Sequence, residues 1–166
     1  MRLNWFLCGI FTIFLTLLTG CYSFTATSLP EHIKTVSINE VENLTNDPLL
    51  GLRLHDAVVD LLRKNASSIR IVDNDADAEF AITLVSYTNV ADNFTGKSEV
   101  ENYKATMVIN VIFRDRVKDE VIYRGQGLRA DGIYDITKNE SEERQGQQRA
   151  IEKLQDLIIN NALAKW

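Results

Sequence analysis

The sequence predicts an α+β fold, a two-layer sandwich in which two helices pack on one face of a mixed, mostly antiparallel sheet of about four strands. Three observations carry this prediction: a β-branched run at 33–38, apolar residues at helical spacing from Leu50, and alternation from Tyr103 to Phe113. They give the order β-α-β-β-β-α. With 166 residues, 45% of them hydrophobic and 25% charged, the chain suits one such domain.

The first half of the predicted domain contains a strand and a helix. The run 33–38 reads Ile-Lys-Thr-Val-Ser-Ile, and such β-branched residues favour a buried strand. Asp47 and Pro48 indicate a helix start, because the carboxylate caps free amides and proline fits the first helical position. This helix ends near Asn65, and its apolar stripe consists of Leu50, Leu54, Ala57, Val58 and Leu61.

The rest of the sheet is predicted after this helix. A short apolar run at 69–72 is followed by strands at about 79–90, 99–114 and 120–130. In the strand 99–114 one face consists of Tyr103, Ala105, Met107, Ile109, Val111 and Phe113. The opposite face carries Lys104, Thr106, Asn110 and Arg114, with Val108 and Ile112 among them. We therefore expect one buried face and one mostly wet face.

A second helix is predicted at about 139–164. Asn139 or Ser141 can cap its first turn. Its apolar stripe consists of Ile151, Leu154, Ile158 and Ala162. Together with the first helix it would cover the buried face of the sheet.

The N-terminus has the pattern of a secretory signal. Arg2 precedes an uncharged, mostly apolar run, which ends in Leu18-Thr19-Gly20-Cys21. These four residues resemble the bacterial lipobox, in which the cysteine thiol is alkylated with diacylglycerol and the chain is cut just before it. We expect a signal peptide at 1–20, a lipidated tether at 21–32 and a single domain at 33–166. An N-terminal anchor helix is the alternative.

Charge and cysteine content narrow the classes of function further. The formal net charge is −5, and without residues 1–20 the chain has 17 basic and 23 acidic residues, a side-chain net charge of −6. This balance argues against a nucleic-acid binder, which depends on Lys and Arg contacts to phosphates. The remaining cysteine is Cys21, so no intramolecular disulfide is expected. Tyr22, where aspartate would favour retention in the inner membrane, resembles an outer-membrane sorting signal.

No motif in the sequence indicates catalysis, a cofactor or a metal. His32 and His55 lack the partners of a zinc site, and we interpret both as solvated surface residues. The run 73–77 resembles the start of an EF-hand loop but lacks the glycine and glutamate that such a loop requires. The run 125–130 matches a loose dinucleotide fingerprint without the helix that would follow it. We therefore predict a protein that is not an enzyme.

Several short patterns resemble the LPS-assembly lipoprotein family, LptE. They occur in the family's order, at similar spacing, over essentially the whole chain after residue 20. The patterns are Gly20-Cys21-Tyr22-Ser23-Phe24-Thr25, residues 29–38 (Leu-Pro-Glu-His-Ile-Lys-Thr-Val-Ser-Ile), Glu42-Asn43-Leu44-Thr45, Ile71-Val72-Asp73, Ala76-Asp77-Ala78 and Val111-Ile112-Phe113-Arg114-Asp115.

This resemblance implies a function in lipopolysaccharide transport. LptE-like proteins are tethered to the inner leaflet of the outer membrane and sit as a plug inside the large β-barrel LptD, whose assembly they assist. A plug needs a polar surface to match a polar lumen. Basic residues of the predicted wet face and its flanking turn are candidates for contact with the barrel or with lipopolysaccharide: Lys104, Arg114 and Arg116.

Two other functions remain open at this point. A periplasmic adaptor or activator lipoprotein that binds another envelope machine would share the same anchor and a similar fold. An enzyme acting on envelope glycans would require a carboxylate-lined cleft, which the sequence does not mark.

Overall fold

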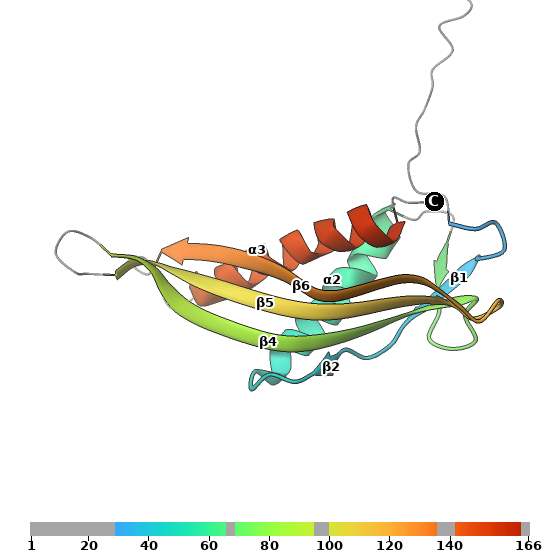
Figure 1. The fold of residues 1–166 in the computed structure, drawn as a ribbon, viewed down its shortest axis with the longest axis horizontal. Helices are drawn as coiled ribbons and strands as arrows, with labels where there is room; N and C mark the ends of the chain where they lie inside the picture. Colours follow the sequence, from blue (N-terminus) through green and yellow to red (C-terminus); the bar gives the residue numbers. More distant parts are fainter. Residues whose placement is uncertain (1–28, 66–68, 95–99, 136–141, 164–166) are drawn as a thin grey trace, which may run out of the picture.

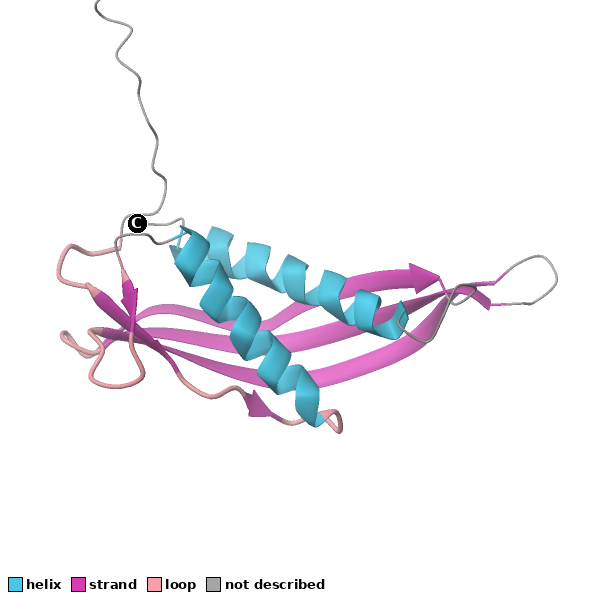
Figure 2. Cartoon of the chain, turned by 180° about the vertical axis from the view of Figure 1, so that it is seen from behind, coloured by secondary structure: helices cyan, strands magenta, loops and turns pink. Residues whose placement is uncertain are grey.

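A computed structural model describes residues 29–65, 69–94, 100–135 and 142–163. Three long strands form an antiparallel sheet, and two helices lie on one of its faces (Figure 1; Figure 2). The strands are β4 (Ala78–Phe94), β5 (Val100–Asp115) and β6 (Glu120–Asp135). The helices are α2 (Pro48–Asn65) and α3 (Glu142–Ile158), and α3 continues as the short π-helix η1 (Ile159–Leu163). The predicted two-layer sandwich, with helices on one face, is confirmed.

Three short strands extend the sheet beyond β4. β1 (Thr35–Ile38) pairs in parallel with β4 and with β3 (Arg70–Ile71), and β2 (Glu42–Asn43) pairs in parallel with a later part of β4. The order across the sheet is β3-β1-β4-β5-β6, with β2 beside β4. The sheet is therefore mixed, as predicted.

The predicted count of about four strands and the order β-α-β-β-β-α are wrong in detail. The described residues form a sheet of six strands, and two of these, β2 and β3, contain only two residues each. No strand is predicted at the position of β2, and two residues are too few to show a strand periodicity. β6 runs five residues past its predicted end at Ala130, since Gly132 and Tyr134 continue its inward face although glycine is uncommon in strands.

The core lies between the sheet and the helices. Both predicted helix stripes are buried there, apart from Ala57, which is half-buried. Phe80 of β4 and Phe113 of β5 stack with their ring centroids 4.2 Å apart and are fully buried. The start of α2 matches the prediction as well, because the Asp47 carboxylate accepts a 3.0 Å hydrogen bond from the Leu49 amide. The predicted caps of the second helix, Asn139 and Ser141, lie outside the described residues.

Candidate interaction surface

Both helices of the described residues lie on one face of the long sheet, so neither covers its outer face (Figure 2). Its β5 residues are the even-numbered ones predicted to be wet, and register aligns them with β4 and β6 in rows. One row contains Thr88, Thr106 and Asp131, and the Thr106 hydroxyl donates a 2.6 Å hydrogen bond to the Asp131 carboxylate. The next contains Ser86, Val108 and Arg129. This face mixes polar, charged and aliphatic side chains.

Each of the three predicted basic residues has a carboxylate partner. Lys104 Nζ lies 2.6 Å from Asp92, Arg114 lies 3.1 Å from Asp119, and Arg116 lies 3.9 Å from Glu79, with nitrogen-to-oxygen distances in each case. These basic side chains are roughly one-third to one-half exposed. The three candidate basic residues are therefore all paired with acidic side chains.

The structure does not bring these three residues into one patch. Lys104 and Arg114 share a face of β5 but are ten residues apart, which in a strand corresponds to about 33 Å. Arg116 lies beyond the strand, in the turn between β5 and β6. Figure 1 shows this turn at the same end of the molecule as β1, whereas Lys104 lies toward the opposite end.

A second polar cluster joins the start of the described chain to the β5–β6 turn. His32 Nε2 lies 2.5 Å from the carboxylate of Asp115, which is almost completely buried. The same carboxylate accepts hydrogen bonds from the amides of Val117 and Lys118. The prediction of His32 as a solvated surface residue is wrong, because its partner comes from a strand 83 residues later in the chain. No local sequence signal reports such a pairing.

Asp77 fixes the beginning of β1 in a similar way. Its carboxylate accepts hydrogen bonds from the amide of Lys34 and from both the amide and the hydroxyl of Thr35, at 2.8 to 2.9 Å. These bonds hold the pKa of Asp77 below its usual value of 3.8. Burial raises the pKa of Asp115, but hydrogen bonds from the Lys118 amide and from His32 outweigh it, so that pKa also lies below 3.8.

A polar bridge connects the two helices to the sheet. Tyr87 of β4 donates a 2.6 Å hydrogen bond to Glu143 and accepts one from the side chain of Gln147, both on α3. Gln147 in turn accepts a hydrogen bond from Arg53 of α2. Burial, together with donation to Glu143, raises the pKa of Tyr87 above its usual range. These groups are engaged in structural contacts rather than displayed to a substrate.

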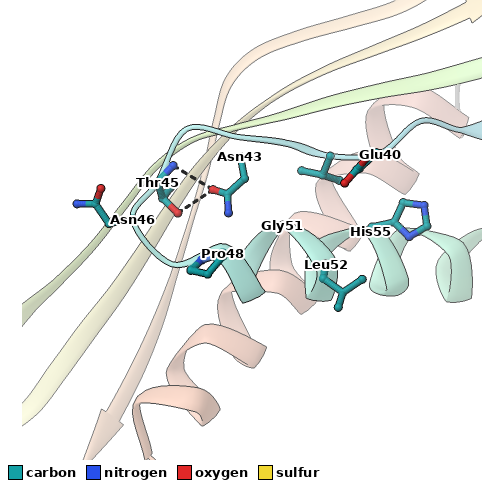
Figure 3. A pocket seen from close by; sticks show the side chains of 9 residues that line it. Glu40, Asn43, Thr45, Asn46, Pro48, Gly51, Leu52 and His55 are labelled. Atoms are coloured by element: carbon teal, nitrogen blue, oxygen red, sulfur yellow. Dashed lines mark hydrogen bonds between the residues drawn. The ribbon is translucent and has the colours of Figure 1, made fainter.

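A shallow groove lies between α2 and the chain that leads into it (Figure 3). Its volume is about 720 Å³, and its lining includes Glu40, Asn43, Thr45, Leu52 and His55. The Asn43 amide oxygen accepts hydrogen bonds from the amide and hydroxyl of Thr45, so this polar group is used within the loop (Figure 3). His55 is in contact with the exposed Asp56 at 3.5 Å.

The remaining sequence candidates can be placed briefly. Among the described residues there is no cluster of three His, Cys, Asp or Glu side chains suited to a metal ion, and no helix is long and apolar enough to cross a membrane. The acidic run 73–77 is a turn whose last carboxylate holds β1. The glycine-containing run 125–130 lies inside β6. Leu18, Thr19, Gly20 and Cys21 lie outside the described residues.

The geometry defines the class of protein: a small two-layer α+β domain with helices on one sheet face and an open, charge-paired surface on the other. The model of the LptE family, described as Lipopolysaccharide-assembly, matches residues 33–162. The chain therefore belongs to the LptE lipopolysaccharide-assembly lipoprotein family, and the resemblance seen in the sequence is confirmed.

Solved structures share the fold at low sequence identity. The hypothetical protein CT253 from Chlamydia trachomatis matches with a TM-score of 0.54 and 11% identity, covering 78% of this chain and 98% of that one. The PelC dodecamer from Paraburkholderia phytofirmans gives 0.53 and 13%, covering 83% and 95%. Protein XCC0632 from Xanthomonas campestris gives 0.53 and 10%, covering 80% and 88%. A comparison with curated protein sequences gives no match.

Proposed function

We propose that the protein is an outer-membrane lipoprotein that serves as the plug and assembly partner of an LptD-like β-barrel, in the transport of lipopolysaccharide to the cell surface. Membership of the LptE family is the observation that carries the proposal. We further propose that residues 1–20 are removed as a signal peptide, directed by Leu18, Thr19 and Gly20, and that Cys21 is lipidated. The tether at 21–32 then links the lipid to the domain at 33–166.

The outer face of the sheet is the surface that we propose contacts the barrel wall. A large barrel has a polar lumen, and a plug must match it with hydrogen bonds and paired charges. Two neighbouring rows on β4, β5 and β6 supply Thr, Ser, Asp and Arg side chains, and within them Thr106 already donates its hydroxyl to Asp131. Figure 1 shows β4 and β5 extending beyond α3, so this end of the sheet is not covered by that helix.

Direct contact with lipopolysaccharide is a separate part of the proposal. The basic residues Lys104, Arg114 and Arg116 each face a carboxylate, which weakens their attraction for a polyanion. Lys104 lies toward the N-terminal end of β5, the end that follows β4 in the chain, and is our candidate for contact with the barrel wall. Reversing the charge of all three residues should reduce binding of lipopolysaccharide to the purified protein, and unchanged binding would exclude them as its site.

The first experiment is purification of the tagged protein from outer membranes in detergent, with identification of co-purifying proteins by mass spectrometry. A stoichiometric, very large, heat-modifiable β-barrel is the expected partner. A soluble envelope enzyme in its place would favour the adaptor function instead. Loss of the barrel after mild salt washing would also contradict a plug enclosed by its partner.

A pair of variants then tests which face is used. Lys104→Glu places a second carboxylate beside Asp92 on the outer face, and like charges at this distance repel each other and the matched partner. Lys64→Glu makes the same charge change on an exposed residue at the end of α2, on the helix side. We expect the first variant to recover less barrel than the second; equal recovery would show that the outer face is not the contact.

A further inference from the structure

The turn between β5 and β6 presents an exposed aliphatic residue between two basic ones. Its sequence is Arg116-Val117-Lys118, and Val117 is 61% exposed, which within the described part of the chain is matched among large hydrophobic side chains by Leu44 at 60%. Arg116 is 46% exposed. An apolar tip flanked by long cationic side chains suits a bilayer interface, where the apolar group enters the acyl boundary and the cations reach the phosphates.

The position of this turn in the fold makes the pattern relevant to a membrane. The described chain begins at Leu29, at the same end of the molecule as the β5–β6 turn (Figure 1). Cys21 is eight residues before Leu29, and eight residues span at most about 28 Å. If Cys21 carries the lipid, as proposed above, Leu29 cannot lie farther than that from the lipid anchor.

The turn and the start of the chain are also held in one rigid arrangement. The buried Asp115 carboxylate contacts His32, the last residue of the tether, and accepts hydrogen bonds from the amides of Val117 and Lys118 in the turn. The amide of Arg116 donates a 2.8 Å hydrogen bond to the carbonyl of Asp77, whose carboxylate holds Lys34 and Thr35. The turn therefore has a fixed position relative to the point where the tether leaves the domain.

We propose that the β5–β6 turn docks on the phospholipid surface, with Val117 entering the interface and Arg116 and Lys118 contacting lipid phosphates. The inference rests on the proposed lipidation of Cys21, because the contact is weak by itself. Asp119 and Glu120 follow directly in the chain, Arg114 is paired with Asp119, and Arg116 lies 3.9 Å from Glu79. These carboxylates reduce the attraction for anionic lipid. The short tether compensates by keeping the turn at a high effective concentration near the bilayer.

Docking of this turn would also orient the whole domain. The tether end would lie at the lipid surface, and the long sheet would run from there to the end where β4 and β5 meet (Figure 1). Arg114 and Arg116 would then lie near the lipid surface, whereas Lys104 would lie toward the other end of the sheet.

The test places an environment-sensitive fluorophore on Val117→Cys in the full, lipidated protein. After processing, Cys8 has been removed with the signal peptide and Cys21 is alkylated, so the introduced thiol is the reactive one. The protein is reconstituted in vesicles of phosphatidylethanolamine and phosphatidylglycerol that contain a spin-labelled quencher lipid. Val90→Cys is the matched control, because Val90 is 50% exposed and lies near the opposite end of the sheet.

We expect the label at residue 117 to shift to shorter wavelength and to be quenched several times more strongly than the label at residue 90. Adding Arg116→Glu and Lys118→Glu should abolish the difference while the protein still floats with the vesicles. A label at 117 that stays in water on a protein that floats would overturn the docking and leave the anchor intact. A protein that does not float, with an unmodified N-terminal peptide by mass spectrometry, would overturn the lipidation and the docking together.

Discussion

At the scale of single residues, two glycines determine how closely α3 approaches β6. A Cβ on Gly132 would lie 1.8 Å from the carbonyl oxygen of Gly146, whereas a Cβ on Gly146 would lie 2.5 Å from the ring of Tyr134. A helix backbone cannot move aside as easily as a side chain can. We predict that Gly132→Ala lowers the free energy of unfolding by about 3 kcal/mol and that Gly146→Ala lowers it by less.

Chemical denaturation of both variants checks this order. Gln148→Ala is the control, since Gln148 is exposed on the same helix, and its effect should stay within about 0.5 kcal/mol. A Gly132→Ala protein as stable as the control would mean that the helix does not approach the strand so closely.

The carboxylates that hold β1 and the β5–β6 turn make stability depend on pH. The pKa values of Asp77, Asp115 and Asp131 lie below 3.8 in the folded protein, through hydrogen bonds that the unfolded chain lacks. A carboxyl group with a lowered pKa in the folded protein stabilises the fold at any pH above its pKa in the unfolded chain. This stabilisation is lost as the pH falls through the pKa of the folded protein. We therefore predict that the urea midpoint falls on acidification below about pH 4.

Asp77→Asn tests the contribution of one of these groups. The variant should be less stable than the original protein at neutral pH, and its stability should fall less steeply with acid, because one of the shifted carboxyls is gone. Urea unfolding at neutral pH and at about pH 3 measures both quantities. Parallel pH profiles for the two proteins would show that the Asp77 hydrogen bonds contribute nothing to the linkage.

At the scale of elements, β6 is an edge strand that α3 partly protects. Arg149 donates a hydrogen bond to the carbonyl of Ile133, and Lys153 donates one to the carbonyl of Asp131. Free edge carbonyls are a template for pairing with another chain. We predict that replacing Arg149 and Lys153 together with Ala promotes self-association, seen as a concentration-dependent increase in mass by analytical ultracentrifugation. Arg144→Ala, an exposed change earlier on α3, should leave the protein unchanged.

Elements with strong local signals are also the ones that the sequence predicts well. The start and end of α2 agree with the prediction because a cap, a proline and an apolar stripe all point to the same helix. The alternation along β5 correctly identifies its buried face from Ala105 to Phe113, but Thr106, which is predicted on the wet face, is only 5% exposed. β2 and the last five residues of β6 were not predictable in this way, since their pairing depends on β4, β5 and α3 rather than on their own residue types.

The candidate site shows the same limit. Alternation places Lys104 and Arg114 on one face, but it does not reveal the carboxylates opposite them. Asp92 and Glu79 come from β4, and their contacts with Lys104 and Arg116 follow from the register between distant segments. The contact of His32 with Asp115 depends on the whole fold for the same reason.

At the scale of the whole molecule, the folded domain and its membrane attachment are separable. Within the described part of the chain, the buried core residues run from Ile33 to Leu163 and Leu29 packs against them, whereas Cys21 lies twelve residues before Ile33. We predict that Cys21→Ser abolishes lipidation and releases the protein from the outer membrane, while its thermal unfolding midpoint stays that of the original domain. Membrane fractionation and circular dichroism measure these two effects separately. Ser23→Ala, two residues away, should alter neither; a Cys21→Ser protein that stays in the membrane would instead point to an uncleaved N-terminal anchor helix.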